Sequence, residues 1–434
     1  MNLGKLCFGI GKLPVLALFG FGCILHAEVV VDSLTIIDHP FQGDLPSTTA
    51  LGVSANGNVV VGMTSYYSEA VLYKKAFRWE AGTAVEIPDL GGNVAPVDSR
   101  ADDVSENGLV IVGKGRTATE IRAMVWYDVV GADIGFDGAS SWVNSISDDG
   151  LVYAGGRQSN TTYRLDSVVW FDGEPEVISE FEGGPSYSQG WGVSPDGSVV
   201  VGEMDSASGH QAFLWSTSTR GPFVGLGELP GGNTFGQARA ASNGGLVIVG
   251  ISVSDTGEEG FVWEDKIMTG LGQLGNSNCG SEALDVSGDG NIIVGKSCVD
   301  SLPVAVLWQR VDNGWAIQSL NKLVYGEEEL TDNDFSLQTA HAISTDGTTI
   351  VGYGLKPADR FKQGFILKVK SGDSLNEWGG FTGVDDKGNV DTGDFMGTLN
   401  VSNAPHIWSF NLGGWVYCEE AHVSETGGWM YFFK

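Results

Sequence analysis

A short pattern of apolar and turn-forming residues recurs seven times along the chain. In each copy an apolar residue precedes a serine, and an Asx-Gly or Gly-Gly pair occupies the second and third positions after it. A mostly β-branched run follows and ends at a second glycine, eight residues after the serine. Asx-Gly and Gly-Gly pairs accept positive φ at both central positions of a type I′ turn, which joins two twisted strands. Each copy therefore predicts a β-hairpin. The serines are Ser54, Ser105, Ser147, Ser194, Ser242, Ser287 and Ser344.

A third strand is expected in each copy because an aromatic position recurs in register. Six copies carry a tryptophan 21 to 25 residues after the serine, and the seventh has Phe365-Ile366-Leu367 instead. Six indoles at one repeated position are better explained by packing between repeats than by ligand stacking. A fourth short strand follows in most copies, as in residues 223–226, and four strands per repeat are typical of a propeller blade. The tryptophans are Trp79, Trp126, Trp170, Trp215, Trp263 and Trp308.

These repeats predict an all-β fold, a seven-bladed β-propeller built from units of about 48 residues. Copy seven supplies three strands and then runs into the Gly/Asp-rich residues 370–373. The segment 33–38 precedes the first copy and has no hairpin of its own. We therefore expect an N-terminal strand to complete the seventh blade, which closes the ring and removes a sheet edge.

The two ends of the chain differ from the repeats. Residues 1–27 have a positive start with Lys5 and Lys12, an apolar stretch over 13–25 and Ala27 before a cleavage point, which is typical of an export signal. Residues 28–371 are assigned to the propeller and 372–434 to an aromatic, Gly-rich C-terminal β appendage. This appendage is either a sugar-binding or anchoring module, or a cap that packs its aromatic residues internally.

No later apolar run reaches the roughly 18 residues that a membrane-spanning helix needs. The expected location is outside the cytoplasm, either extracellular, on the cell surface or periplasmic. Export permits disulfides, and Cys279 and Cys298 flank the turn at 289–290. An ideal hairpin places residue 298 opposite 281, so a small bulge would be needed to bridge the two; the alternative is two buried free thiols. Cys418 is then left as a free thiol.

The repeat is similar to that of a known family. The stretch Leu226–Gly232, followed by Ala240–Gly250 and Gly260–Trp263, resembles the bacterial HAF-type extracellular repeats, named for a His-Ala-Phe triplet before the tryptophan. Here the histidine is mostly replaced, as in Gln211-Ala212-Phe213 and Lys75-Ala76-Phe77. The resemblance covers roughly residues 33–370. It implies export and a propeller-like fold, and it brings no catalytic residues.

Motifs for catalysis are missing. The six histidines are scattered, and neither a Gly-x-Ser-x-Gly elbow nor a phosphate-binding loop occurs. No catalytic residue, metal ligand or cofactor is assigned, although the loop 385–394 offers oxygen ligands for calcium without the frame of an EF-hand. The sequence favours a binding or scaffolding module. The alternative is an enzyme acting on extracellular polysaccharide through two channel carboxylates about 5–10 Å apart, one with a raised pKa.

Charge narrows the choice of partner. The formal net charge is −30 and the pI about 4.3, which argues against nucleic-acid binding. Within this acidic chain, the loops between the second and third strands of blades seven, one, two and three are rich in cations. We expect this face to bind an anionic glycan or a partner protein, the alternative being ordinary solvated loops. The candidate ligand-binding residues are Lys114, Arg116, Arg122, Arg157, Arg164, Arg360 and Lys362.

Overall fold

The computed structural model describes two compact units. The larger covers Val31–Val369, and the smaller combines Met1–Val30 with Lys370–Lys434. Several of the predicted features lie outside the described residues. They are the boundaries after residues 27 and 371, the export signal, Cys418, and the calcium-candidate loop apart from a short backbone strand. Described are residues 29–39, 44–90, 98–117, 119–159, 164–178, 187–206, 209–232, 234–275, 279–311, 314–326, 334–356 and 361–370, with the backbone of seven short strands between 389 and 432.

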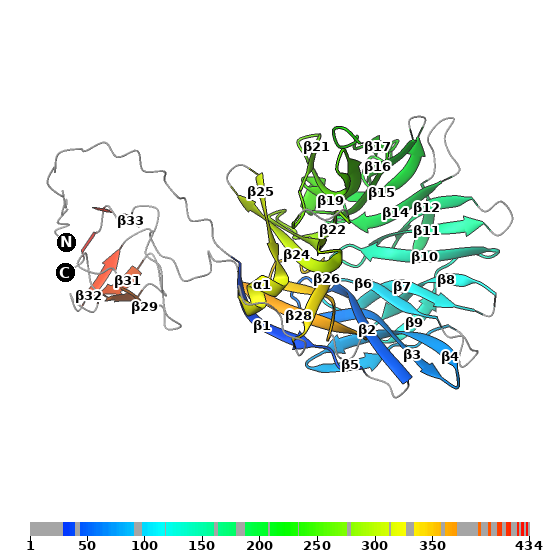
Figure 1. The fold of residues 1–434 in the computed structure, drawn as a ribbon, viewed down its shortest axis with the longest axis horizontal. Helices are drawn as coiled ribbons and strands as arrows, with labels where there is room; N and C mark the ends of the chain where they lie inside the picture. Colours follow the sequence, from blue (N-terminus) through cyan, green and yellow to red (C-terminus); the bar gives the residue numbers. More distant parts are fainter. Residues whose placement is uncertain are drawn as a thin grey trace. The chain divides into compact units, whose positions relative to one another are not determined.

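Seven four-stranded antiparallel sheets make up the larger unit, so the predicted seven-bladed β-propeller is confirmed (Figure 1). In blades one to six the strands follow chain order from the innermost to the outermost. Blade one contains β2 (Asp44–Val53), β3 (Val59–Ser68), β4 (Val71–Glu80) and β5 (Thr83–Glu86). Blade two contains β6 (Arg100–Val104), β7 (Val110–Arg116), β8 (Ile121–Tyr127) and β9 (Val130–Asp133). Blade three contains β10 (Ala139–Ile146), β11 (Val152–Ser159), β12 (Leu165–Phe171) and β13 (Glu174–Val177).

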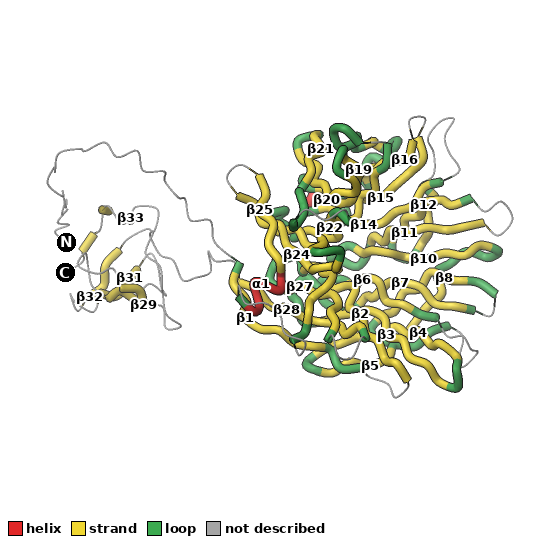
Figure 2. Tube along the Cα trace, viewed as in Figure 1, coloured by secondary structure: helices red, strands yellow, loops and turns green. Residues whose placement is uncertain are grey.

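The remaining blades repeat this arrangement, and strands dominate the fold (Figure 2). Blade four contains β14 (Ser188–Val193), β15 (Val199–Ser206), β16 (Gly209–Ser216) and β17 (Val224–Gly225). Blade five contains β18 (Gly236–Ala241), β19 (Ile248–Ser254), β20 (Gly257–Glu264) and β21 (Ile267–Gly270), with the 3-10 turn η1 (Asn243–Gly245). Blade six contains β22 (Ser281–Val286), β23 (Ile292–Val299), β24 (Leu302–Val311) and β25 (Gly314–Ser319), followed by the short helix α1 (Leu320–Tyr325).

The smaller unit is described only as backbone. It holds a five-stranded sheet and a two-stranded sheet, which agree with a small β appendage. The first contains β29 (Asn389–Asp391), β30 (Thr398–Asn400), β31 (His406–Ser409), β32 (Gly414–Tyr417) and β35 (Tyr431–Phe432), and the second contains β33 (Val423–Ser424) and β34 (Gly427–Gly428).

The repeated serine shapes the turn between the first two strands of every blade. In blade one the Ser54 hydroxyl accepts a hydrogen bond from the amide of Val59 at 3.0 Å and donates one to Asn56 at 2.9 Å. The amide of Gly57 donates to the Ser54 carbonyl at 2.7 Å. The serine is buried in all seven copies, so its hydroxyl is a turn cap, as expected.

The turn type differs from the predicted type I′ in blade one, whereas in blade five both central residues, Gly244 and Gly245, have the expected positive φ. Among the residues at this turn in blade one, only Gly57 has a positive φ, while Asn56 does not. The Asn56 side chain accepts the amide of Asn58 at 3.0 Å, which holds the asparagine backbone outside the left-handed region. The result is a type I turn closed by a left-handed glycine, another common hairpin connection. The corresponding glycines of the seven copies have φ between 65° and 75°.

The aromatic position packs one blade against the preceding one. Trp126, Trp170 and Trp308 are fully buried, and their indole nitrogens donate to the carbonyls of Pro88, Ile134 and Leu271 in the preceding blades. Trp215 is 3 % exposed, and Trp79 and Trp263 are half-buried against the same kind of cluster. Each core cluster therefore joins two neighbouring blades rather than filling one blade.

The second repeated glycine leaves room for a close backbone contact. A Cβ built on this glycine would lie between 1.9 and 2.1 Å from a carbonyl oxygen of the innermost strand in all seven blades. No side chain fits at that distance. The innermost strand carries a β-bulge directly after the residue that faces this glycine, for example between Ala101 and Asp103 opposite Gly113. The glycine thus allows one extra residue in every innermost strand.

The ring closes through the N-terminal strand, as predicted. Blade seven has the order β1-β28-β27-β26, with β1 (Val30–Ile36), β28 (Lys362–Lys370), β27 (Thr349–Leu355) and β26 (Ser336–Ile343). The strand begins a few residues earlier than expected. Beyond its end, the amide of Ile37 donates to the Gly364 carbonyl at 2.8 Å, and the Ile37 side chain is fully buried between blades seven and one.

Deleting residues 28–40 should lower the thermal unfolding midpoint and promote aggregation, because the outer edge of blade seven becomes free. The milder Ile37→Ala should cost about 2–5 kcal/mol of unfolding free energy, measured by denaturant titration. Ile267→Ala is the matched control, since Ile267 is 63% exposed. Equal stability of the deletion variant and the full chain would contradict the closure.

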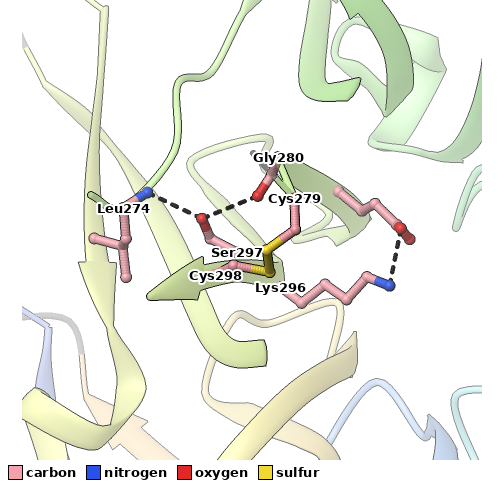
Figure 3. The surroundings of a disulfide bond; sticks show 7 residues. Leu274, Cys279, Gly280, Lys296, Ser297 and Cys298 are labelled. Carbon is pink, nitrogen blue, oxygen red and sulfur yellow. Dashed lines mark hydrogen bonds and ion pairs between the residues drawn. A yellow bond between two sulfur atoms is a disulfide. The ribbon is translucent and has the colours of Figure 1, made fainter. Parts of the chain in front are cut away.

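Cys279 and Cys298 form a disulfide that ties the loop entering blade six to strand β23 (Figure 3). The bulge in β22 moves the pairing by one residue, so that Ser281 faces Ser297 rather than residue 298. This shift is the small bulge that the bridge requires. The adjacent Ser297 hydroxyl accepts the amide of Leu274 at 2.9 Å and donates to the Gly280 carbonyl at 3.3 Å.

Replacing both cysteines by serine should lower the free energy of unfolding by about 3 kcal/mol, the loop-entropy value for a closure of about 20 residues. Denaturant unfolding of the double variant, compared with the untreated and the reduced parent, measures this. A double variant as stable as the oxidised parent would contradict a structural role.

Candidate functional site

The seven bulges place one side chain each into a central channel. These extra residues lie three positions before the repeated serines and line a single cavity of about 220 Å³. They come from the innermost strands of all seven blades and differ widely in chemistry. They are Leu51, Asp102, Asn144, Trp191, Arg239, Leu284 and His341.

Our sequence reasoning missed these residues, although a signal was present. The positions on either side of the bulge are mostly small: alanine, glycine or serine in most copies. Between them stands the one position that changes from leucine to aspartate, asparagine, tryptophan, arginine and histidine. Aligning the copies on the serine would have isolated it.

One end of the channel is rich in cations. This end, called here the loop face, carries the loops between the second and third strands. Arg100 lies 2.5 Å from Asp102, whose side chain is only 10% exposed, and the negative charge of Asp102 raises the pKa of Arg100. Lys114 is paired with Arg100 across strands β6 and β7, and burial together with Arg100 lowers the pKa of Lys114.

On the opposite wall an arginine lies over an indole. The guanidinium of Arg239 is 4.2 Å from the centroid of a Trp191 ring. The Trp191 indole nitrogen donates to Glu203 at 2.9 Å, and Tyr187 and His210 hydrogen-bond the same carboxylate at 2.8 and 2.7 Å. Burial disfavours the charge of Glu203, yet these three hydrogen bonds lower its pKa overall. The network holds the Trp191 ring in one orientation.

Three buried polar atoms around this mouth have no hydrogen-bond partner among the described residues. They are Nε of Arg100, Nε of Arg239 and Oδ2 of Asp102. Leaving such groups unpaired in a protein costs free energy, so buried polar atoms are normally satisfied by protein, water or a bound group. All three residues line the channel cavity.

His341 lies on β26, the innermost strand of blade seven, and also lines the cavity. Burial and the nearby cations Lys362, Lys296 and Arg100 lower the pKa of His341 to about 4. Its imidazole is therefore neutral at physiological pH and can donate one hydrogen bond and accept another.

Two carboxylates deeper in the channel connect neighbouring blades. Asp103 Oδ2 accepts the Ile146 amide and the Ser145 hydroxyl, each at 3.0 Å, and Oδ1 accepts its neighbour's amide at 2.8 Å. Asp285 likewise accepts the Ile343 amide of blade seven at 2.8 Å. Burial outweighs these hydrogen bonds and raises the pKa of each aspartate to about 7.

A third carboxylate lies near the far end of the channel. Asp148 accepts a hydrogen bond from the Thr345 hydroxyl at 3.0 Å, which links blade three to blade seven. Burial, together with the negative charges of Glu106 and Asp149, raises the pKa of Asp148 to about 6. Among the described residues, no group of three or more His, Cys, Asp or Glu side chains is arranged to hold a metal ion.

Several of the predicted rim cations are already neutralised. Arg122 pairs with Glu120 at 3.3 Å, with Asp133 at 3.0 Å and with Asp137 at 3.5 Å. These aspartates belong to the fourth strand of blade two and the loop after it, outside the loops between second and third strands on which the prediction was based. Arg122 is thus held by its own blade.

The other candidates are distributed around the loop face. Arg157 and Arg164 share Asp166 at 3.2 and 2.6 Å, and Lys362 lies 4.0 Å from the Tyr353 ring. Arg116, at the end of β7, makes no ion pair with a described residue, and Arg360 lies outside the described residues. Lys114 interacts electrostatically with Arg100 and Asp102 of the channel wall, and Lys362 with His341, but none of the predicted cations that the structure describes lines the cavity itself.

Comparison with known proteins supports the fold. No family model and no curated protein sequence matches the chain. Among solved structures, an oligogalacturonate lyase from Vibrio parahaemolyticus has a TM-score of 0.50 at 11% identity, over 79% of this chain and 98% of that one. The β-propeller domain of the Trilobed protease from Pyrococcus furiosus has a TM-score of 0.51 at 12% identity, over 76% and 97%. Such low identities show a shared propeller fold and nothing about activity.

No helix in the described part of the propeller is long and apolar enough to span a bilayer.

The channel aspartates predict a pH dependence. Their pKa is about 7 in the folded protein and about 3.9 in an unfolded chain. Between these values the folded state binds more protons, so the free energy of unfolding falls as the pH rises from 4 to 7. We expect a lower melting temperature at pH 8 than at pH 5. In ¹³C spectra two carboxyl signals should titrate near pH 7 and be absent from Asp103→Asn/Asp285→Asn. Midpoints near pH 4 for both would refute the assignment.

Proposed function

We propose that this protein is an exported, non-catalytic binding module whose ligand site is the mouth of the channel on the loop face. One observation carries the proposal: Arg100, Arg239 and Asp102, each with a buried polar atom that has no partner among the described residues, line one cavity. Two of these atoms belong to guanidinium groups, which favours an anionic group on an extracellular glycan or on a partner protein. On the repeat residues we also propose that the chain belongs to the HAF-type repeat family.

The electrostatic surroundings support anion binding at this site. Around Lys114, Arg239 and His341 the described residues include six cations and four carboxylates. Within a chain of net charge −30 these cations gather at the loop-face end, whereas three further carboxylates of the same cavity, Asp103, Asp148 and Asp285, lie deeper and have raised pKa values. A concave cationic site in an acidic protein attracts an anion locally while the remaining surface repels it. The cations are Lys74, Arg100, Lys114, Arg239, Lys296 and Lys362, and the carboxylates are Asp98, Asp102, Glu203 and Glu282.

A polysaccharide-active enzyme is the second candidate, and the raised pKa values of Asp103, Asp148 and Asp285 favour it. Against it, both oxygens of Asp103 and of Asp285 accept backbone amides. A carboxyl held in this way is occupied by the fold and has little freedom to transfer a proton to a substrate. Release of new reducing ends from a polyuronate, lost in Asp103→Asn, would establish the enzyme instead.

The binding proposal is tested by chromatography of the full chain. Columns of a fragmented polyuronate and of sulfated dextran should retain it at low salt, and plain dextran should not. Arg100→Gln and Arg239→Gln should each weaken retention about 10- to 100-fold, because each removes charged hydrogen bonds of about 1.5–3 kcal/mol. Arg157→Gln and Arg164→Gln are controls on the same face. Absence of retention, or loss only in the rim variants, would refute the channel site.

A further inference from the structure

The residues at the channel mouth present both hydrogen-bond donors and a hydrogen-bond acceptor to a ligand. Nε of Arg100 and Nε of Arg239 are charged donors that need an acceptor. Oδ2 of Asp102 is an acceptor that needs a donor, and the Asp102 side chain is nine-tenths buried. A fully ionised sulfate offers acceptors only, so it would leave Asp102 unsatisfied. The complementary ligand therefore carries both an anionic group and neutral or positive hydrogen-bond donors.

The charges around the site indicate whether the ligand's hydrogen-bond donor is a positively charged ammonium group or a neutral hydroxyl. An ammonium group would enter beside the cations Arg100 and Lys114, which repel a further positive charge. Asp102 is also already paired with Arg100 at 2.5 Å. A hydroxyl can satisfy Oδ2 of Asp102 without adding charge, and the neutral His341 offers a second partner for a hydroxyl. A hydroxylated carboxylate fits better than a zwitterionic amino acid.

The walls and the size of the cavity define the shape of the ligand. Trp191 contributes an aromatic surface that is held by its hydrogen bond to Glu203, and Leu51 and Leu284 contribute apolar atoms. Aromatic side chains pack well against the apolar faces of rings. The volume of about 220 Å³ is below the roughly 300–1,000 Å³ of sites for drug-sized ligands. The mouth thus suits one small ring rather than an extended segment.

We propose that the channel mouth binds a single uronic acid unit, a sugar ring bearing a carboxylate, presented end-on from the terminus of a glycan. In this arrangement Arg100 and Arg239 bind the carboxylate, Asp102 accepts a ring hydroxyl and Trp191 borders the ring. This inference rests on the proposed function, because it names the ligand class of the same site.

Calorimetric titration of the full chain with D-glucuronate, D-glucose and inorganic sulfate tests the inference. Glucuronate should bind at least 10-fold more tightly than glucose, which lacks the carboxylate, and than sulfate, which lacks the hydroxyls. Arg239→Gln should weaken glucuronate binding at least 10-fold. Arg220→Gln is the matched control, since Arg220 also lies over an aromatic ring, Phe171 at 4.3 Å, but outside the channel.

The variant Asp102→Asn distinguishes recognition of the ligand's hydroxyl groups from recognition of its anionic group. It should weaken glucuronate binding and leave sulfate binding equal or stronger, because it removes a hydroxyl acceptor and a negative charge together. Thermal unfolding of each variant shows whether it is folded. If Asp102→Asn does not fold, the comparison of glucuronate binding by Arg239→Gln and by the parent tests the inference.

Each other outcome overturns the inference in a different way. Glucose binding as tightly as glucuronate would show that the guanidinium groups do not recognise a carboxylate. Sulfate binding as tightly as glucuronate would show a general anion site and leave the proposed function intact. If none of the three binds, the uronate assignment is wrong, and retention on the polysaccharide columns decides the proposed function separately.

Discussion

The contact between the second repeated glycine and a carbonyl oxygen of the innermost strand is the constraint on which the candidate site depends. At 1.9 to 2.1 Å from a built Cβ, this oxygen excludes every residue but glycine. The close approach lets the innermost strand carry one residue more than its partner. Without it the strands would pair in regular alternation, and the side chains that now line the channel would be moved out of register.

A second set of contacts fixes the blades relative to one another around the same axis. Asp103 and Asp285 accept amides of the next blade, and Ser145 does the same for Val193 at 3.2 Å. These positions lie one residue after the bulge, so the element that projects a side chain into the channel also supports its neighbour. Farther from the axis, the repeated indoles also connect neighbouring blades, because they donate hydrogen bonds to carbonyls of the preceding blade. Neighbouring blades are therefore connected both at the channel and farther out.

The sequence alone was sufficient for the architecture. Serine, glycine and tryptophan recur with fixed offsets, and the unpaired segment at 33–38 indicated the closing strand correctly. The turn type was wrong for the Asx-Gly copies, because Asx-Gly pairs occur in both turn classes and the Asx side chain hydrogen-bonds the turn instead of taking a positive φ. In the Gly-Gly copy of blade five both central residues have a positive φ. The bulges were not predicted either, although the second repeated glycine, which faces the residue before each bulge, is visible in the sequence.

The site was predicted less well, for a physical reason. Counting charges over the loops between the second and third strands places Arg122 on a free rim, whereas Asp133 and Asp137 reach it from the neighbouring strand and loop. Pairing across strands cannot be read from loop composition. Likewise the meeting of Arg239, Asp102 and His341 depends on residues more than a hundred positions apart converging on one axis.

The position three before each serine has a further consequence for how such a chain can diversify. Its backbone course is set by the second glycine of the repeat, the serine turn and the adjoining blade, so the type of side chain at this position does not define the course of the strand. Exchanging one of these seven residues would alter the chemistry of the pore while the wheel around it stays unchanged. Single substitutions at these seven positions can therefore change the ligand specificity of the channel without changing the propeller fold.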